Sequence, residues 1–150
     1  MVAALICLGS LSLLAQSDSG LQELTLSEEV WREVVPRILK DKFQPAKDPQ
    51  TVELYDEGLR WEWLPAIENV SFVLLPKTEI ELRKLKVYFF RTKARRESNG
   101  RIEVDFGFGD LFCNNSGSTW TYRESKGPST LKRSSGGWGT GCGSGDGTGH

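Results

Sequence analysis

A β-hairpin in the middle of the chain constrains the fold more tightly than any other sequence feature. Tyr88–Phe90 opens one strand, Ile102–Phe108 forms the other, and Ser98-Asn99-Gly100 lies between them. A two-residue Asn-Gly turn would pair Arg95 with Val104 and so put a charge on the apolar face. A three-residue loop that ends in a left-handed glycine shifts the register by one residue. Because register follows the buried face, we expect the three-residue loop.

The expected register divides the hairpin into a wet face and a buried face. On the wet face, Arg95 lies opposite Glu103 and Lys93 lies opposite Asp105. The expected pairs on the buried face are Phe90 with Phe108, Thr92 with Phe106, and Ala94 with Val104. Opposite charges across the wet face then support the same pairing that buries the aromatic residues.

Two helices are expected in the first third of the chain. Thr25 and Glu28 have the spacing of a capping box, and an apolar stripe follows them. The stripe consists of Val30, Val34 and Ile38, with Trp31, Val35 and Leu39 beside them. Pro36 predicts a kink or a break near Val35. A second, shorter helix is expected from Asp48 to Gly58.

The remaining elements favour a sheet. The expected strands are Leu59–Trp63, Asn69–Leu75, Thr119–Glu124 and Thr130–Arg133, and a short helix is expected over Lys77–Lys86. Helices that precede mostly antiparallel strands predict an α+β fold, with N-terminal helices packed on a curved, mainly antiparallel sheet. We expect a signal peptide over residues 1–17, a single domain over 18–135 and a glycine-rich tail over 136–150.

The first seventeen residues carry the signature of an export signal. They contain no charged side chain, are apolar from Val2 to Leu14, and end in Ala15-Gln16-Ser17. This pattern predicts a secretory signal peptide that is cleaved near Ser17, which places the mature chain in a secreted or periplasmic location with no membrane span. An uncleaved anchor and a buried core segment remain as alternatives.

Cleavage would leave two of the three cysteines, Cys113 and Cys142. In an oxidising compartment a lone pair of cysteines forms a disulfide, and this one would hold the glycine-rich end of the chain. The two lack the close spacing of a zinc knuckle, so no metal site is expected.

Charge is distributed unevenly along the chain. Asp18–Glu68 has 6 basic and 12 acidic residues, whereas Lys77–Arg101 has 9 basic and 3 acidic ones. Packing of the two regions against each other is one explanation, and a polyanion-binding face is another. The densest basic cluster consists of Arg91, Lys93, Arg95 and Arg96. The candidate aromatic binding residues are Trp61, Trp63, Trp120 and Tyr122, which would otherwise belong to the core.

The sequence provides no recognisable catalytic machinery, and neither a catalytic residue nor a cofactor is expected. His150, the last residue, is the single histidine, and no phosphate-binding glycine loop occurs. Ser129 and Lys132 have the Ser-x-x-Lys spacing of penicillin-interacting enzymes, but here they follow a turn and enter a strand. Glu62 lies between two tryptophans, and in a strand it would point away from both.

Several segments resemble small exported bacterial domains of unassigned activity. They are Phe72-Val73-Leu74-Leu75, the Thr78–Lys86 helix, the Ile102–Phe108 strand, Cys113 with Trp120-Thr121-Tyr122-Arg123, and Gly136-Gly137-Trp138-Gly139. The order of helix and meander is also similar to cystatin-like and NTF2-like folds, over about Leu26 to Trp138. The resemblance contains no catalytic motif, so it transfers no functional residue.

We therefore expect a secreted or periplasmic binding or structural module without catalytic activity. A cell-envelope glycan or another polyanion is the candidate partner, and no nucleic acid is expected. The first alternative is a carboxylate-based enzyme of glycan hydrolase or isomerase type, with a pocket in the concave sheet. The second is polyanion binding through the basic hairpin. A buried, unpaired carboxylate in a pocket would favour the enzyme.

Overall fold

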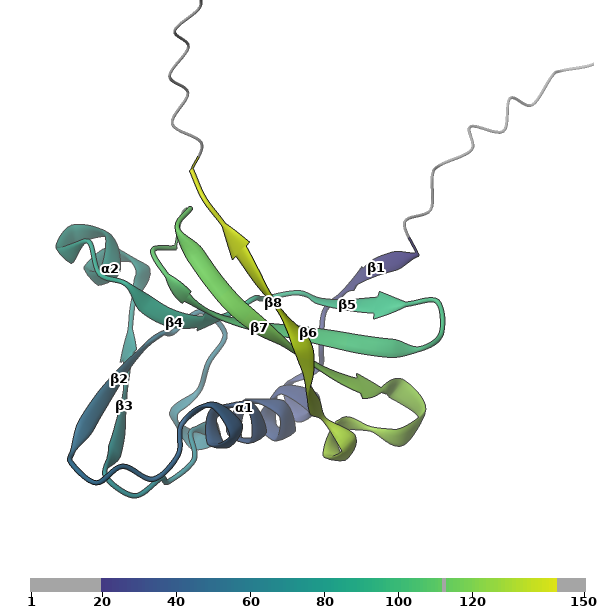
Figure 1. The fold of residues 1–150 in the computed structure, drawn as a ribbon, viewed down its shortest axis with the longest axis horizontal. Coiled ribbons are helices and arrows are strands. Elements are labelled where there is room, and N and C mark those ends of the chain that lie inside the picture. Colours follow the sequence, from purple (N-terminus) through teal and green to yellow (C-terminus); the bar gives the residue numbers. More distant parts are fainter. Residues whose placement is uncertain (1–19, 112, 143–150) are drawn as a thin grey trace, which may run out of the picture.

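The computed structural model describes residues 20–111 and 113–142, where a curled open sheet carries α1 against one face and α2 at its β2–β3 end (Figure 1). The strands are β1 Leu21–Leu24, β2 Gln50–Tyr55, β3 Val70–Leu75, β4 Val87–Phe90, β5 Ala94–Glu97, β6 Arg101–Gly109, β7 Asn115–Arg123 and β8 Lys132–Thr140. The helices are α1 Glu28–Lys42 and α2 Lys77–Arg83, with short 3-10 helices at Trp61–Trp63, Glu124–Lys126 and Pro128–Thr130. The expected signal peptide, residues 1–17, lies outside the described residues.

The long strand β6 organises the sheet. The hydrogen-bonded order is β1-β5-β6-β4-β2-β3, while β7 and then β8 lie on the other edge of β6. Along one edge, β4 pairs with Phe106–Gly109 of β6, and β5 pairs with Ile102 and Glu103. This edge therefore carries two arms, which we name the β4 arm (β4, β2 and β3) and the β5 arm (β5 and β1). β2 runs parallel to β3 and β4, and the other named strand pairs are antiparallel.

The expected loop between β5 and β6 is confirmed. Ser98-Asn99-Gly100 separates the two strands, Gly100 has a φ of 77°, and Arg95 lies opposite Glu103. The N–H of Gly100 donates to the carbonyl of Glu97 at 2.9 Å and closes the turn. Glycine adopts this left-handed conformation at little cost, and so the turn fixes the register of its two neighbouring strands.

Farther from the turn the expected register is wrong by two residues. Phe90 lies opposite Phe106 instead of Phe108. The segment Arg91–Lys93, between β4 and β5, belongs to neither strand and absorbs the difference, as a bulge does. Lys93 consequently does not lie opposite Asp105, and the Asp105 carboxylate bonds to other residues instead.

Helix α1 is confirmed, with corrections at its start and its middle. Its cap is Ser27, whose Oγ accepts the N–H of Val30 at 3.3 Å, rather than the expected Thr25. The helix continues through Pro36 to Lys42, so the expected break near Val35 is absent. Its buried residues Val34, Val35, Ile38 and Leu39 join one core with Ala94, Ile102, Val104, Phe106 and Trp120 of the sheet. Each fully buried aliphatic side chain contributes about 1.5–3 kcal/mol to that packing.

Two elements of the first half differ from expectation. Asp48–Gly58, expected as a helix, contains strand β2, because alternate residues Val52 and Leu54 are buried while the strand pairs in parallel with β3. Leu59–Trp63, expected as a strand, contains a 3-10 helix whose backbone bonds close locally. The strand Val70–Leu75 and the helix Lys77–Arg83 are confirmed.

The mixture of helix and strand is confirmed, but the expected N-terminal layer of helices is not. Strand β1 precedes α1, α2 follows β3, and strands dominate the architecture. Helix α1 connects β1 to β2, and α2 connects β3 to β4. The crossover that the parallel pair of β2 and β3 requires contains only the 3-10 helix Trp61–Trp63.

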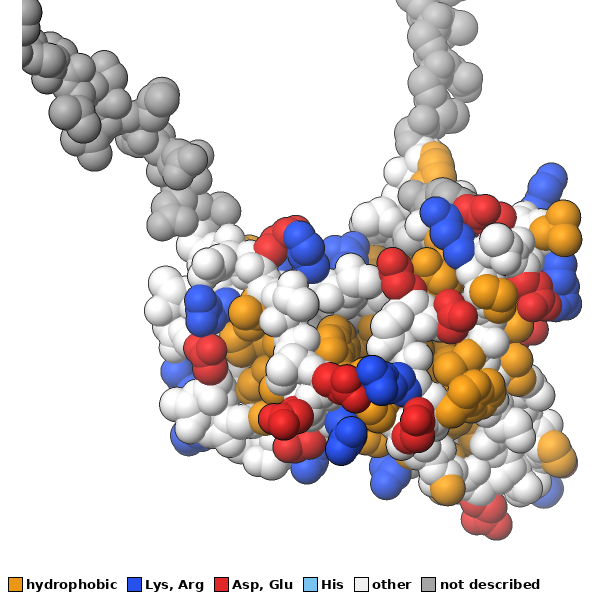
Figure 2. Space-filling model, turned by 180° about the vertical axis from the view of Figure 1, so that it is seen from behind, with side chains coloured by type: hydrophobic (Ala, Val, Ile, Leu, Met, Phe, Trp, Pro, Cys, Tyr) orange, Lys and Arg blue, Asp and Glu red, His pale blue; other side chains and the backbone are white. Residues whose placement is uncertain are grey.

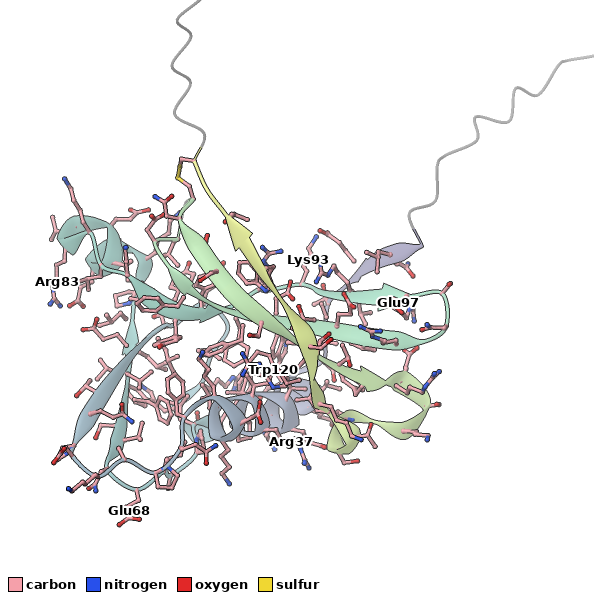
Figure 3. All side chains as sticks on the ribbon, viewed as in Figure 1. Arg37, Glu68, Arg83, Lys93, Glu97 and Trp120 are labelled. Carbon is pink, nitrogen blue, oxygen red and sulfur yellow. A yellow bond between two sulfur atoms is a disulfide. The ribbon has the colours of Figure 1, made fainter. Side chains whose placement is uncertain are left out.

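The glycine-rich end of the chain is part of the sheet up to Thr140. Strand β8 includes Gly136–Thr140, which was expected to belong to a tail, and pairs with β7. Residues 143–150 of that tail lie outside the described residues. The expected disulfide joins Cys113 to Cys142, with Cα atoms 5.0 Å apart, and is drawn in yellow in Figure 3. It ties the loop between β6 and β7 to the end of β8.

A row of four residues crosses the face of the sheet that α1 does not cover. Phe89 lies opposite Gly107, Gly107 opposite Gly117, and Gly117 opposite Trp138. The Trp138 indole lies over both glycines and ends near the Phe89 ring, at a centroid distance of 6.2 Å. A Cβ atom would stand 2.6 Å from this indole at Gly107 and 2.5 Å from it at Gly117. The two glycines therefore make room for the ring.

This row predicts different effects for three glycine substitutions. Gly107→Ala and Gly117→Ala should each lower the free energy of unfolding by about 1–3 kcal/mol, because the added methyl group would overlap Trp138 and, at Gly117, also the backbone carbonyl oxygen of Phe106. Gly136→Ala, in β8, is the matched control, since nothing lies within 4 Å of its new methyl group. Its effect should stay within about 0.5 kcal/mol. Urea unfolding followed by tryptophan fluorescence measures all three, and equal losses would contradict the packing argument.

Candidate functional site

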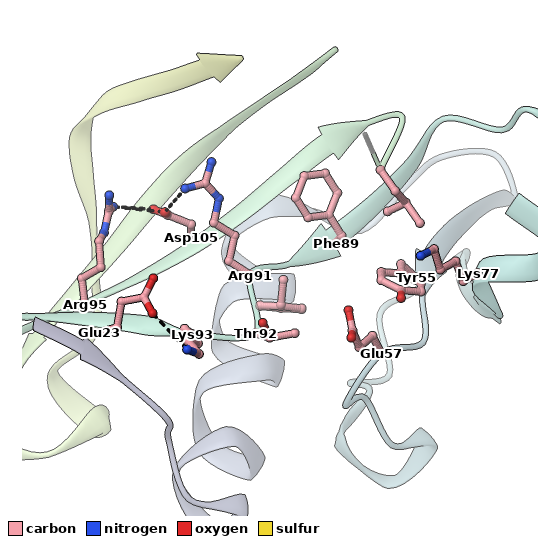
Figure 4. Close-up of a pocket in the computed structure, with 12 residues that line it drawn as sticks. Glu23, Tyr55, Glu57, Lys77, Phe89, Arg91, Thr92, Lys93, Arg95 and Asp105 are labelled. Atoms are coloured by element: carbon pink, nitrogen blue, oxygen red, sulfur yellow. Dashed lines mark hydrogen bonds and ion pairs between the residues drawn. The ribbon is translucent and has the colours of Figure 1, made fainter. Parts of the chain in front are cut away.

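A cleft of about 620 Å³ opens where the two arms leave β6. The β5 arm contributes Glu23 and Arg95 to its wall, the β4 arm contributes Tyr55 and Phe89, and Arg91 comes from the irregular segment between the arms. Figure 4 shows these side chains facing one another across the opening. The two-residue offset between the β4 and β5 pairings thus separates the two arms, and the cleft lies between them.

Asp105 holds the β6 wall of the cleft together. The Asp105 side chain is 4% exposed, and Asp105 is the only charged residue that is buried among the described residues. It forms ion pairs with Arg95 at 3.0 Å and Arg91 at 3.4 Å, and it accepts a hydrogen bond from the Thr119 hydroxyl at 2.6 Å. A buried carboxylate needs such partners, because an unpaired charge would be costly to desolvate.

The cluster of Arg91, Arg95 and Asp105 carries an excess positive charge. Two guanidinium groups share the one buried carboxylate, and Arg95 also contacts Glu103 at 3.2 Å. Glu103 in turn bonds Arg101 at 3.1 Å, so its charge is already divided between two arginines. The side chains of Arg91 and Arg95 are 41% and 34% exposed. Arg101 is also paired with Glu97 at 3.9 Å, so the wider network of three arginines and three carboxylates is balanced. Along the cleft as a whole, four basic side chains (Lys77, Arg91, Lys93 and Arg95) and three acidic ones (Glu23, Glu57 and Asp105) leave a formal charge of +1.

Trp138 fixes the position of Arg91 from the other side. The guanidinium carbon of Arg91 lies 4.2 Å from the centre of the Trp138 ring, within the range of a cation–π interaction. Because Asp105 and Trp138 both hold the guanidinium, its orientation is largely set before any ligand arrives. Such preorganisation reduces the entropy that binding must overcome.

The opposite wall is more acidic. Glu57 and Tyr55 stand there beside Lys77, at the start of α2 (Figure 4). Burial, followed by the charge and hydrogen bond of Glu57, raises the pKa of the Tyr55 hydroxyl above its usual value of 10.0. Tyr55 is thus a hydrogen-bond donor at neutral pH. Lys77 is paired with Glu81 at 3.6 Å.

The structure brings three of the four expected basic residues to the cleft. Arg91, Lys93 and Arg95 line it, and Lys93 is paired with Glu23 at 3.0 Å. Arg96 does not line the cleft: it bonds Glu124 at 3.3 Å and the amide oxygen of Gln22 at 2.8 Å. Successive residues of a strand point to opposite faces, and this alternation separates Arg96 from Arg95.

The four expected aromatic residues do not line the cleft. Trp63, Trp120 and Tyr122 are buried in the core, and Trp61 is 59% exposed on its 3-10 helix. The Trp120 indole N–H donates to Asp41 at 2.9 Å, as a buried indole requires. Burial, followed by nearby Glu124 and Glu33, raises the pKa of Tyr122. Because Trp61 is exposed and Trp63 is buried, the two rings do not form a pair beside Glu62 that could stack on a sugar.

Sequence reasoning missed the residues that organise the cleft. Asp105 was assigned to a solvated hairpin pair, Tyr55 and Glu57 to a helix, and Trp138 to the tail. The closest sequence signal was the alternation in Ile102–Phe108, where an aspartate lies between Val104 and Phe106. That signal places the carboxylate on the face opposite to the core but does not reveal the two arginines that bury it.

Comparison with protein-family models, curated proteins and solved structures gives no match to this chain. The similarity to cystatin-like and NTF2-like folds therefore stays a prediction. Within residues 20–111 and 113–142 no cluster of three or more metal-binding side chains is found. No helix in the same ranges has the length and hydropathy needed to cross a bilayer.

The buried cluster predicts a large effect of one isosteric substitution. Asp105→Asn should lower the free energy of unfolding by about 2–3 kcal/mol, because it leaves two partly buried guanidinium groups without their shared carboxylate. Glu23→Gln removes an exposed partner of Lys93 and should cost less than about 1 kcal/mol. Urea unfolding at neutral pH measures both. Equal losses would show that Asp105 does not hold the cluster together.

Proposed function

We propose that the protein is a binding module without catalytic activity, which holds an anionic group of its ligand against Arg91 and Arg95. The observation that carries this proposal is the arrangement of two partly exposed guanidinium groups around one buried carboxylate. Guanidinium groups donate paired hydrogen bonds to carboxylate, phosphate and sulfate oxygens. The remaining positive charge and the fixed orientation of Arg91 both support such a contact.

The bonding of Asp105 argues against the carboxylate enzyme that the sequence left as an alternative. A catalytic acid or base has to exchange a proton with a substrate, and it is typically a carboxylate with a perturbed pKa in a pocket. Each oxygen of Asp105 is already bonded to an arginine, and Oδ1 also accepts the Thr119 hydroxyl. Asp105 is better suited to positioning the arginines than to proton transfer.

The ligand class follows from how the basic residues are distributed. A long polyanion needs a row of cations without acidic neighbours, but Lys93 and Arg96, on either side of Arg95 in the sequence, are each paired with a glutamate. Figure 2 shows acidic and basic side chains interleaved over one face of the molecule, with apolar side chains between them. We therefore favour a ligand that presents one anionic group, such as an acidic residue of a cell-envelope glycan.

Titration with simple anions tests this function. Acetate or sulfate, added at constant ionic strength, should shift the Arg91 side-chain N–H signals in NMR spectra and saturate with a Kd of about 1 mM, the value for two charge-assisted hydrogen bonds. Arg91→Gln should weaken this binding at least about tenfold. Arg96→Gln is the matched control and should leave it unchanged. Shifts without saturation, or equal effects of both variants, would refute the proposal.

We also place the protein in an exported location. The disulfide between Cys113 and Cys142 supports this, because such bonds persist in oxidising compartments and are rare in the cytosol. The apolar segment Val2–Leu14 supports it independently at the level of sequence.

Export predicts a specific mass for the mature chain. When the full chain is expressed in a bacterium, intact-mass analysis of the exported fraction should show an N-terminus near Asp18 and the loss of two hydrogen atoms at Cys113 and Cys142. Treatment with a reductant should restore those two hydrogens without changing the N-terminus. Recovery of the uncleaved chain with both thiols free in the cytosol would contradict this location.

A further inference from the structure

A second, smaller cavity of about 70 Å³ adjoins the cleft. It is bounded by Trp31 of α1, Leu59 and Phe90, and it shares Phe90, Arg91, Thr92 and Glu57 with the cleft. Phe90 and Trp31 belong to the core side of the sheet, where their rings make an edge contact with centroids 5.9 Å apart. The opening between the arms therefore leads from the cleft toward apolar side chains next to α1.

The size and lining of this cavity limit what can enter it. A single water molecule requires roughly 10–15 Å³ of cavity volume, so a cavity of about 70 Å³ admits a group of about five heavy atoms. Trp31, Leu59 and Phe90 offer such a group apolar surface. Arg91 lies at the boundary of both cavities, and so the anionic site and the apolar pocket are contiguous.

We propose that the ligand of the cleft is a small amphipathic anion, with its charged group on Arg91 and Arg95 and a short apolar group of about five heavy atoms in the pocket beside Trp31. This inference rests on the proposed function and adds the second half of the ligand. A fully polar anion would leave the apolar pocket empty, whereas an apolar substituent next to the charge fills it. Pockets of this kind combine apolar walls with a few fixed polar groups.

Glu57 determines which way the ligand is oriented. Its carboxylate stands across the cleft from Arg91 and also borders the smaller cavity (Figure 4). An anion is repelled from that wall and attracted to the arginine wall. Glu57→Gln should therefore tighten anion binding, whereas Arg91→Gln weakens it. Opposite effects of these two neutral amides, together with no effect of Arg96→Gln, distinguish binding in the cleft from nonspecific adsorption, because Arg96→Gln changes the net charge as much as Arg91→Gln does.

A series of straight-chain carboxylates from acetate to octanoate tests the inference on the unmodified protein. Each added methylene that enters the pocket should strengthen binding about fourfold, the value expected for burial of one methylene. The gain should stop near hexanoate, when the pocket is full. Leu59 methyl and Trp31 indole signals should shift with the longer acids and not with acetate, while 1-butanol, which lacks the charge, should bind far more weakly.

A pocket-filling variant provides the second measurement. Leu59→Phe should abolish the dependence on chain length while Arg91 still responds to acetate, and Leu82→Phe, at a side chain 85% exposed on α2, is the matched control. Equal affinities for acetate and hexanoate would overturn this inference and leave the anion site intact. Binding that keeps rising beyond hexanoate, or that Leu59→Phe leaves unaltered, would also overturn it. No saturable binding of any acid would overturn the proposed function itself.

Discussion

One edge of β6 pairs with two different strands, and the cleft depends on the mismatch between them. Near the turn, β5 is held in register by Gly100, while β4 is two residues out of step. The intervening segment Arg91–Lys93 therefore leaves the sheet. A continuous strand would have carried the pairing straight through and closed the opening between the arms. The irregularity exposes Arg91 and gives the cleft access to the apolar residues near α1.

The same irregularity explains how a carboxylate can be buried on a sheet face without a large loss of stability from desolvation. Asp105 lies on β6 opposite the point where the chain bulges, so Arg91 within the bulge and Arg95 just after it both reach the carboxylate. Removing a charge from water costs several kcal/mol unless partners compensate. Here two arginines share one carboxylate, and the anion binding that we propose depends on this arrangement. Trp138 adds rigidity because it covers the guanidinium of Arg91.

A feature of the fold can be predicted from the sequence when residues close together in the chain determine it. The loop at Ser98–Gly100, helix α1, strand β3 and the disulfide were predicted correctly because nearby residues or a single pair of cysteines determine them. Strand β2 was mistaken for a helix because its pairing with β3 in parallel is a contact between distant segments, and its capping and stop residues also suit a helix. The site was only half predicted, since the sequence identified the basic residues but not their contacts with Asp105. The convergence of Arg91 and Arg95 on this carboxylate follows from a bulge that no local sequence pattern indicates.

The C-terminal strand connects the stability of the fold to the geometry of the site. Strand β8 is rich in glycine and serine and offers little side-chain burial of its own. It is held by pairing with β7, by Trp138 over Gly107 and Gly117, and by the disulfide that closes 29 residues. A closed loop of that length contributes about 3–4 kcal/mol in the chain-entropy account. Because β8 carries the ring that contacts Arg91, the disulfide supports the proposed anion site from a distance, through the order it imposes on an otherwise weakly packed strand.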